Sequence, residues 1–449
     1  IFAKSNALVK YNKGQDVRDV QLGICGLGTV GSGVFNIIRR NSIEINQRLN
    51  RNLVVTHIGA RRDNPECDVR DVQVSRDIFQ VPKDPQVEVV VELIGGTTVA
   101  LDLVMTSIRN RKHVVTANKA LIAEHGSEIF EAAQDLGVMV RYEAAVAGGI
   151  PIIKALREGL SANRISWLAG IINGTTNYIL SEMDSKGRNF GDVLMEAQQK
   201  GYAESDPTFD IEGIDAAHKL AILASLAFSI PLNIDNIYVE GITKLDQCDI
   251  AYARELGYVI KHLGLARQCA NGVELRVHPT LVPKSSLIAG VNDVLNAVMV
   301  NSDAAGSTLY HGRGAGSDPT ASSVISDLCD VSRVIDNSPD TWVPSLGCQL
   351  ENLKSQDIVD VDSVETCFYL RFLMRDTPGA LSEVTKVIGD AGISIEAIVQ
   401  KEQPISAEYV NVIVVTNGVI EQDLKQALSK IEKLETVSGS AVTIRLEHL

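Results

Sequence analysis

The sequence predicts an α/β protein of three units: a doubly wound nucleotide-binding domain, an α+β middle domain, and a C-terminal module with the ferredoxin-like order βαββαβ. Three observations support this prediction. A glycine-rich turn follows an apolar run near the N-terminus, strand and helix patterns alternate through residues 1–150, and the order βαββαβ is apparent over residues 363–449. The length of 449 residues allows about three domains of roughly 150 residues each.

The composition is typical of a folded, soluble protein, with 45% hydrophobic and 22% charged residues. A net charge of −14 argues against a protein whose main partner is the nucleic-acid backbone. The seven cysteines follow neither a zinc nor a disulfide spacing, so we expect reduced thiols. Residues 1–19 contain no apolar targeting segment, and the most apolar run, 220–232, is too short to span a bilayer. We therefore expect a cytoplasmic protein without a membrane partner.

A nucleotide site is predicted by VQLGICGLGTVG, residues 20–31, in which an apolar run leads into a GxGxxG turn and then a helical pattern. In such a turn the first glycine permits the bend, the second lets the backbone approach a pyrophosphate, and the third allows close packing of helix and strand. The N–H groups that open the helix then face the phosphates. A glycine turn without a nucleotide is the alternative. The candidate cofactor contacts are Gly26, Gly28, Thr29, Val30 and Gly31.

Further strands are expected at 53–60, 87–93, 113–116 and 138–142, with helices between them, as in a parallel sheet. Arg61 and Arg62 follow the second strand, where a fold selective for NAD usually has an acidic residue. Two arginines there favour the 2′-phosphate of NADP, although NAD is possible and a solvated arginine pair is the alternative. Ligands bind at the carboxyl ends of such strands. This places Gly95, Thr97 and Lys119 beside the cofactor.

Four motifs occur in order: TANK at 116–119, EAAVAGGIP at 143–151, INGTTNYIL within 171–180, and GYAESDPTFDIEGIDAAHKLAIL at 201–223. Together they closely resemble homoserine dehydrogenase. The resemblance covers roughly residues 1–340. It implies reversible NAD(P)H-dependent reduction of L-aspartate 4-semialdehyde to L-homoserine, in the synthesis of threonine and methionine.

The last of these motifs, at 201–223, contains several closely spaced carboxylates before Lys219. Gly213 interrupts the chain, and Asp215 and Lys219 are four residues apart in the helix expected after it, so their side chains share a face. A solvated Asp–Lys pair is the alternative. Because Glu204 and Asp210 come from the preceding loop, we expect a cationic guest, the α-ammonium group of an amino acid. The resemblance implies that Lys119 and Lys219 are the catalytic lysines and that the substrate contacts are Thr175, Tyr202, Glu204, Asp210 and Asp215.

Two further sites are implied by the resemblance. A monovalent cation such as sodium would have a structural role, bound by main-chain oxygens of Glu143, Val146, Gly148 and Ile150. A turn without a metal is the alternative there. The glycine loop HGRGAGSDP, residues 311–319, would return to the nucleotide domain and place Gly314 and Gly316 near the cofactor. For these two glycines a plain helix entry is the alternative.

The module at 363–449 has DTPG before its first expected helix and GISI after it, and it resembles an ACT domain, a sensor of small ligands. The resemblance implies allosteric feedback inhibition by L-threonine in pairs of modules. A dimerisation module without a ligand is the alternative. The candidate effector contacts are Asp376, Gly379, Gly392 and Ile393.

The domain boundaries follow from these patterns. We expect a nucleotide domain at 1–150 completed by about 312–340, a substrate and dimerisation domain at 151–311, a linker at 341–362, and the ACT module at 363–449. A homodimer or homotetramer is expected. The competing hypotheses are another NADP-dependent oxidoreductase of amino acids or aldehydes, and a non-catalytic sensor that binds a nucleotide and an amino acid.

Overall fold

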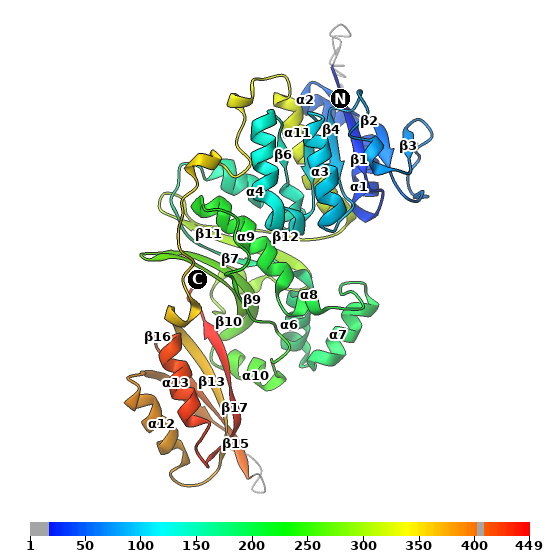
Figure 1. The fold of residues 1–449 in the computed structure, drawn as a ribbon. Coiled ribbons are helices and arrows are strands. Elements are labelled where there is room, and N and C mark those ends of the chain that lie inside the picture. Colours follow the sequence, from blue (N-terminus) through cyan, green and yellow to red (C-terminus); the bar gives the residue numbers. More distant parts are fainter. Residues whose placement is uncertain (1–17, 402–407) are drawn as a thin grey trace, which may run out of the picture.

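The computed structural model describes residues 18–401 and 408–449. Its N-terminal part contains a six-stranded parallel sheet in the order β3-β2-β1-β4-β5-β6 (Figure 1). The predicted doubly wound sheet is thereby confirmed. The short edge strand β3 was not predicted, because three residues carry no readable periodicity. The strands are β1 (Asp19–Cys25), β2 (Asn52–Gly59), β3 (Gln73–Ser75), β4 (Val89–Glu92), β5 (His113–Thr116) and β6 (Val140–Arg141).

Helices cover both faces of this sheet. Successive residues of β4 point to opposite faces, since Val89 and Val91 pack in one core cluster while Val90 packs in another. The first cluster includes residues of α1 (Thr29–Arg40), α2 (Ser42–Leu49) and α11 (Ser317–Val334). On the other face lie α3 (Thr98–Arg109) and α4 (Lys119–Leu136). Burial on both faces explains why these strands read as continuous apolar runs.

Helix α11 packs against the nucleotide sheet although it lies far along the chain from β6. A Cβ on Gly33 of α1 would lie 2.6 Å from Ser317 Oγ and 3.2 Å from Ala321 Cβ, so only glycine permits this approach. Ala321 and Val324 are fully buried in the same cluster as Leu22 of β1. The segment 317–334 therefore completes the core of the N-terminal part.

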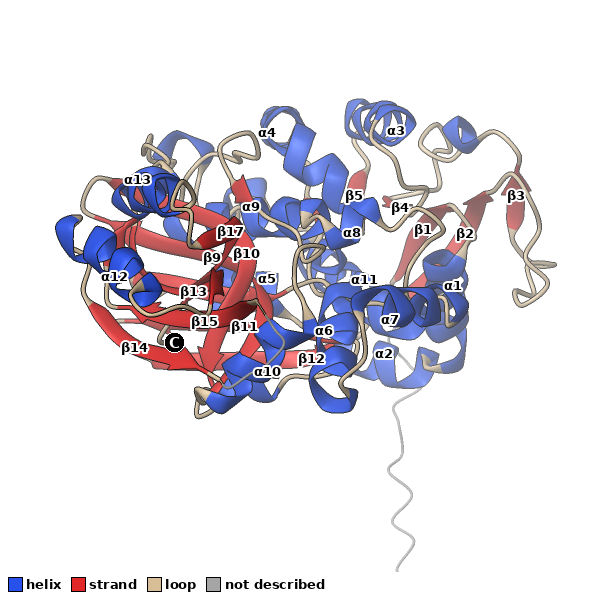
Figure 2. Cartoon of the chain, turned by 90° about the horizontal axis from the view of Figure 1, so that it is seen from below, coloured by secondary structure: helices blue, strands red, loops and turns tan. Residues whose placement is uncertain are grey.

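The rest of the chain builds an 11-stranded sheet. Nine of its strands follow the order β12-β11-β7-β9-β10-β17-β13-β15-β14, and off this path β8 pairs with β10 and β16 with β13. Neighbouring strands from β12 to β10 are antiparallel. Helices pack on the faces of this sheet (Figure 2). The strands are β7 (Ile165–Ile171), β8 (Tyr238–Val239), β9 (Tyr258–Cys269), β10 (Gly272–Pro283), β11 (Leu295–Ser302) and β12 (Gly306–Arg313). The helices are α5 (Ile152–Lys154), α6 (Gly174–Lys186), α7 (Phe190–Gln199), α8 (Thr208–Ile211), α9 (Ile214–Phe228) and α10 (Gln247–Glu255).

The C-terminal module has the predicted order of elements. Its strands lie in the sequence β17-β13-β15-β14, and the neighbouring strands are antiparallel, which is the ferredoxin-like arrangement. The two helices pack on one face over a core that includes Phe368 and Val384. The elements are β13 (Glu365–Arg375), α12 (Ala380–Asp390), β14 (Ile395–Gln400), β15 (Tyr409–Thr416), β16 (Val419–Ile420), α13 (Glu421–Ile431) and β17 (Val437–Leu446).

The module is joined to the middle of the molecule through β17, which pairs in parallel with β10 at Thr280–Arg445 and Leu281–Leu446. Segment 341–362, which precedes the module, contains only short helical turns. It is held by main-chain hydrogen bonds, from Lys354 N to Ser229 O and from Val359 N to Val273 O. Within the described ranges no helix has both the length and the hydropathy that a bilayer crossing requires.

A buried ion pair also connects the C-terminal module to helix α10. Asp249 of α10 is fully buried and accepts hydrogen bonds from Arg371 Nε at 2.6 Å and Arg371 Nη2 at 3.0 Å. The hydroxyl of Tyr369 donates to the same carboxylate at 3.0 Å. Removing one member of such a pair leaves a charge in a low-dielectric interior, which costs about 3–5 kcal/mol.

We predict that Arg371→Ala lowers the free energy of unfolding by about 3 kcal/mol, because Asp249 loses its charged partner. Arg375→Ala on the same strand should change stability by less than about 1 kcal/mol, since Arg375 is half exposed and lies 3.9 Å from Glu408. Chemical denaturation of both variants and of the unaltered protein measures the difference. Equal stability of the two variants would contradict the importance of this pair.

Candidate active site

The glycine turn after β1 has the geometry that a pyrophosphate requires. Gly26 has φ +101°, and a Cβ on Gly31 would lie 2.0 Å from Gly26 O, so side chains are excluded at both positions. Nothing lies within 4 Å of a Cβ built on Gly28, which precedes α1 without capping it through a side chain. Gly28 and Thr29 are exposed, so the first turn of α1 is open to a ligand beside Gly28. Thr29 and Val30 begin the same helix.

The loops after β4 and β5 are tied together by Glu92, a residue that sequence reasoning did not select. Its buried carboxylate accepts hydrogen bonds from Ile94 N at 2.9 Å, Gly95 N at 3.2 Å and Thr116 Oγ1 at 2.6 Å. Burial raises the pKa of Glu92 although these donors oppose the shift. Asn118 Nδ2 also donates to Gly96 O at 2.6 Å. The loop that includes Gly95 and Thr97 is thus held beside the start of α4, where Lys119 lies.

Arg61 and Arg62 lie on the surface just after β2, as expected. Neither forms an ion pair within residues 18–401 and 408–449. The neighbouring carboxylate of Asp63 is engaged by Arg76 at 2.8 Å, so it does not neutralise them. The two guanidinium groups remain available to an anion at this end of the sheet.

The centre of the predicted substrate site is Asp215, in the first turn of α9. Its carboxylate is 2% exposed and lies between two lysines, with Lys119 Nζ 2.5 Å from Oδ1 and Lys219 Nζ 2.7 Å from Oδ2. Lys219 also donates to Ile172 O at 2.6 Å. Because Lys119 belongs to α4 and Lys219 to α9, the pair of contacts joins the nucleotide sheet to the middle of the molecule.

A second carboxylate, Asp210, lies beside this centre and has neutral partners. Asn173 Nδ2 donates to Asp210 Oδ1 at 2.8 Å and to Asp215 Oδ2 at 2.8 Å. Thr175 Oγ1 lies 3.2 Å from Asp210 Oδ2 and donates to Tyr202 O at 2.6 Å. The crowded acids therefore divide into two kinds. Asp215 pairs with two lysines, whereas the partners of Asp210 within the described residues are neutral hydrogen-bond donors.

Burial and charge shift the titration of these groups in different directions. Burial acts to raise the pKa of Asp215, but Lys219 and Lys119 outweigh it and hold the pKa well below its usual range. Burial raises the pKa of Asp210, with Asn173 opposing and Asp215 adding to the shift. Burial also lowers the pKa of Lys219, against the attraction of Asp215 and with the repulsion of Lys119. Lys219 is therefore closer to losing a proton than a surface lysine is.

The structure brings most, but not all, of the predicted substrate residues into contact. Tyr202 is 44% exposed, and its ring packs edge-on against Tyr178 with centroids 5.1 Å apart. The Glu204 side chain is exposed, and in the described chain only its main-chain oxygen has a hydrogen-bond partner, Gln198. Phe209, which was not selected, packs against His218 and lies 5.7 Å from Lys119 Nζ.

Asn173 was also missed, although a signal for part of its role is present in the sequence. An asparagine directly before GTTN is a typical N-cap, and its side chain accepts from Thr176 N at 2.8 Å. Its contacts to Asp210 and Asp215 depend on where α8 and α9 pack, which the local pattern does not contain.

The turn at 146–150 and the loop at 313–316 lie against each other. A Cβ on Gly148 would lie 2.4 Å from Gly314 O, and Gly149 N donates to Arg313 O at 3.0 Å. Gly316 has φ +117° and precedes α11. Among the expected cation ligands, Gly148 O accepts from Ser323 Oγ at 2.6 Å and Ile150 O from Ile152 N at 2.8 Å. No group of three or more His, Cys, Asp or Glu side chains in the described residues could hold a metal ion.

The predicted effector residues lie at the two ends of α12. Asp376 and Gly379 precede the helix, and Gly392 and Ile393 follow it. An 11-residue helix is about 16 Å long, so one small ligand cannot contact both ends within one module.

Comparisons with known proteins agree with this architecture. The family model for homoserine dehydrogenase matches residues 151–329, the model for the homoserine dehydrogenase NAD binding domain matches 26–143, and the ACT domain model matches 368–435. The homoserine dehydrogenase of Pseudomonas aeruginosa is 58% identical over 433 residues, which are 96% of this chain and 100% of that protein. The homoserine dehydrogenase of Bacillus subtilis is 37% identical over 442 residues, 96% of this chain and 99% of that one.

Solved structures show the same fold. The crystal structure of a homoserine dehydrogenase from Thiobacillus denitrificans has a TM-score of 0.91 and 52% identity, covering 96% of this chain and 99% of that one. A homoserine dehydrogenase structure from S. aureus has a TM-score of 0.74 and 29% identity, covering 96% of this chain and 100% of that one. The chain belongs to the homoserine dehydrogenase family, the NAD(P)-binding oxidoreductases that act on a CH–OH group, and it carries a C-terminal ACT domain.

Proposed function

We propose that this chain interconverts L-aspartate 4-semialdehyde and L-homoserine, with the reaction centred on Lys219. The observation that carries the proposal is the buried Asp215 carboxylate between two lysines, next to a second carboxylate that forms no ion pair with any described residue. When bound, the nicotinamide cofactor exchanges a hydride with the carbon of the aldehyde or alcohol. The glycine turn, the open space at Gly28 and the exposed start of α1 suit its pyrophosphate.

Lys219 is the proton-transfer residue of the proposal. An ammonium group has three N–H donors, and two of them are used by Ile172 O and Asp215. One donor is left for the oxygen of the substrate. In reduction Lys219 gives its proton to the aldehyde oxygen, directly or through a water; in oxidation its neutral form takes the proton of the alcohol. General acid–base catalysis of this kind contributes about 10²–10⁴-fold in rate.

Lys119 and the polar residues around Asp210 position the substrate. Lys119 shares Asp215 with Lys219, so its charge both orients the carboxylate and favours loss of a proton from Lys219. Asp210, with Thr175 beside it, is suited to the α-ammonium group, because Asp215 already has two cationic partners. We assign Tyr202 and Glu204 to the edge of the same site, on the loop between α7 and α8.

NADP is the proposed cofactor. Arg61 and Arg62 are exposed after β2, and the nearest acid in sequence, Asp63, is engaged by Arg76. A 2′-phosphate carries negative charge and strong acceptor oxygens, which a guanidinium group matches better than a ribose hydroxyl. The loops with Gly95, Thr97, Gly314 and Gly316 are proposed to border the nicotinamide end.

A structural sodium ion is a further proposal, with main-chain oxygens of Glu143, Val146, Gly148 and Ile150 as ligands. Carbonyl oxygens suit a hard cation, and each can accept two interactions, so the hydrogen bonds from Ser323 and Ile152 do not exclude it. Thermal unfolding in sodium and in tetramethylammonium salts tests the proposal, and identical midpoints would rule it out.

L-Threonine is the proposed effector, bound between two ACT modules. Because Asp376 and Gly379 lie about 16 Å from Gly392 and Ile393 in one chain, a shared site needs the first pair from one module and the second from its neighbour. This supports a homodimer or homotetramer, which light scattering would measure. Inhibition by threonine that persists unchanged in Asp376→Ala would contradict the proposed contact.

The first prediction concerns Lys219. In Lys219→Met, oxidation of L-homoserine should fall by about 10²-fold or more, because the proton acceptor is lost while the apolar stem is kept. Absorbance of the reduced nicotinamide measures the rate. Lys186→Met is the matched control, since Lys186 lies on the exposed face of α6 and pairs with Glu182. A folded Lys219→Met variant with more than about a tenth of the activity would contradict the role.

The second prediction concerns pH. Oxidation needs neutral Lys219, so kcat should rise with pH and level off above the pKa of Lys219, which burial lowers from 10.5. Asp215 opposes that lowering, so removing its charge in Asp215→Asn should lower the pKa further. The rise of kcat then moves to lower pH, although its plateau falls. Profiles of kcat against pH for the unaltered protein and for Asp215→Asn measure this shift. A rise of kcat that moves to higher pH in Asp215→Asn would refute the role of Lys219 as the titrating group.

The third prediction concerns cofactor choice. Replacing Arg61 and Arg62 together by alanine should raise KM for NADP by about tenfold or more and leave KM for NAD nearly unchanged, because only NADP carries the 2′-phosphate. Arg70→Ala is a control on the same loop, where Arg70 pairs with Asp68. Equal changes in KM for NADP and NAD would show that the two arginines do not bind the 2′-phosphate.

A further inference from the structure

Arg141 of β6 is a buried guanidinium group without a carboxylate partner. It is 4% exposed, and its hydrogen bonds go to two main-chain oxygens, Val343 O at 2.7 Å and Val140 O at 3.5 Å. Nε has no hydrogen-bond partner in the described chain. No carboxylate oxygen of residues 18–401 and 408–449 lies within 4.0 Å of its nitrogens, in contrast to Arg157, which pairs with Glu158. A guanidinium group has five donors, so most of them lack an acceptor.

The surrounding charges do not compensate Arg141. Burial, and then the like charge of Arg157, lower its pKa to about 10, so it remains protonated near neutral pH. Asp327 and Glu158 oppose this effect only in part, and both are engaged elsewhere, Asp327 by Glu143 N and Glu158 by Arg157. A buried charge without a partner costs several kcal/mol. One bound anion beside Arg141 would balance its charge.

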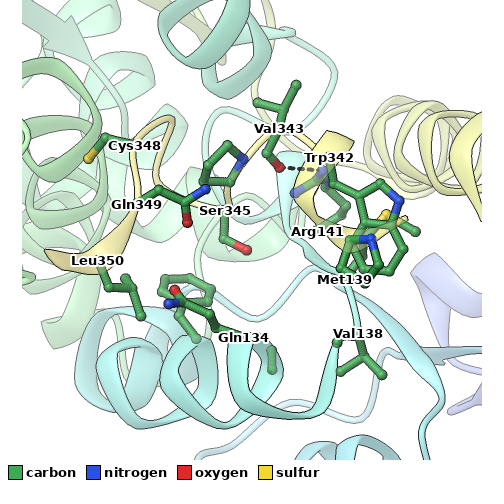
Figure 3. Close-up of a pocket in the computed structure, with 15 residues that line it drawn as sticks. Gln134, Val138, Met139, Arg141, Trp342, Val343, Ser345, Cys348, Gln349 and Leu350 are labelled. Carbon is green, nitrogen blue, oxygen red and sulfur yellow. Dashed lines mark hydrogen bonds between the residues drawn. The ribbon is translucent and has the colours of Figure 1, made fainter. Parts of the chain in front are cut away.

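Arg141 lines a cavity of about 100 Å³ between α4, β6 and the segment 339–350. Figure 3 shows its side chain beside Trp342 and Val343, with the bond to Val343 drawn as a dashed line. Apolar side chains such as Phe130, Val138 and Leu350 share the other walls with the polar residues Gln134, Ser345 and Gln349. Among the described residues, no Asp or Glu lines the cavity. The lining therefore offers one cation, apolar and neutral polar walls, and no carboxylate for an ammonium group.

This cavity is separate from the candidate active site. Gly137 and Val138 of its lining precede β6, and the ring of Trp342 packs against His113, at the start of β5. These positions mark the amino ends of the strands, whereas the glycine turn and the loops at 94–97 and 116–119 follow the carboxyl ends. Neither substrate nor nicotinamide cofactor is expected to reach it.

We propose that this cavity binds a small monocarboxylate with a short apolar chain. The carboxylate accepts hydrogen bonds from the guanidinium group of Arg141, and the chain packs against Trp342 and Leu350. Because no acidic side chain is present to receive an ammonium group, amino acids are selected against, including the proposed substrate and effector. An apolar cavity of about 150 Å³ binds benzene, which has six non-hydrogen atoms, so this smaller cavity suits a ligand of about four or five.

A ligand in the cavity would strengthen the existing contact between segment 339–350 and β6. Tyr142 Oη donates to Ser345 O at 2.7 Å, and Ser345 Oγ donates to Val140 O at 3.1 Å, so segment 339–350 is tied to β6 beside the cavity. A ligand held by Arg141 and Trp342 adds a bridge between the same two elements. Segment 339–350 precedes the ACT module in the chain. The ligand would therefore stabilise the packing of this segment against the nucleotide domain.

Equilibrium dialysis of the full chain against radiolabelled propanoate tests the proposal. We expect one saturable equivalent per chain, with a Kd of about 1 mM or below. Propan-1-ol, which lacks the charge, and L-alanine, which adds an ammonium group, should compete at least about tenfold more weakly. The test does not depend on catalytic activity, so its failure is distinct from failure of the proposed function.

Three variants locate the bound propanoate. Arg141→Met removes the cation, and Ala133→Leu fills the cavity from α4 without changing charge, so each should abolish binding. The second variant keeps the test valid if the first does not fold. Arg111→Met is the matched control, because Arg111 is exposed and also donates to a main-chain oxygen, Leu136 O at 3.0 Å. Absence of saturable binding to the unaltered protein, or binding unchanged in Ala133→Leu, would overturn the proposal.

Discussion

The buried carboxylate of Asp215 is the group on which the arrangement of the candidate active site depends. It forms ion pairs with Lys119 of the nucleotide domain and with Lys219 of its own helix, so it joins the nucleotide domain to the part of the molecule proposed to hold the substrate. In a low-dielectric interior such a carboxylate must be paired, which fixes the position of both lysines. The lowered pKa of Lys219 follows from the same burial. The proposed proton transfer and the domain arrangement would therefore share one physical cause.

A similar rule explains how the domains are held together elsewhere. Asp249 and Arg371 form a buried pair between α10 and the ACT module, and Glu447 at the end of the chain pairs with Arg267 and the buried Arg276. Each of these charges has an opposite partner from a distant segment. Arg141 is different, because its acceptors are neutral main-chain oxygens beside a cavity. The contrast is the physical basis for assigning it an external anion.

Much of the fold was predictable because its signals are local. The apolar runs that became β1, β2, β4 and β5 are continuous since both faces of the sheet are covered, and the order of elements in the ACT module follows from simple periodicity. The short strand β3 was missed because three residues show no period. The parallel pairing of β17 with β10 was missed because it depends on the register of two strands far apart in the chain.

For the site, the sequence by itself determined which kinds of groups are present and that Asp215 and Lys219 share a helical face, since the spacing of a helix is a local property. It also determined the glycine turn. Only the tertiary structure decided that Lys119 shares the carboxylate of Asp215, that Asp210 is left with neutral donors, and that Asn173 bridges the two acids. The reason is physical: ion pairs and hydrogen bonds act over about 3 Å, and only packing brings distant segments that close.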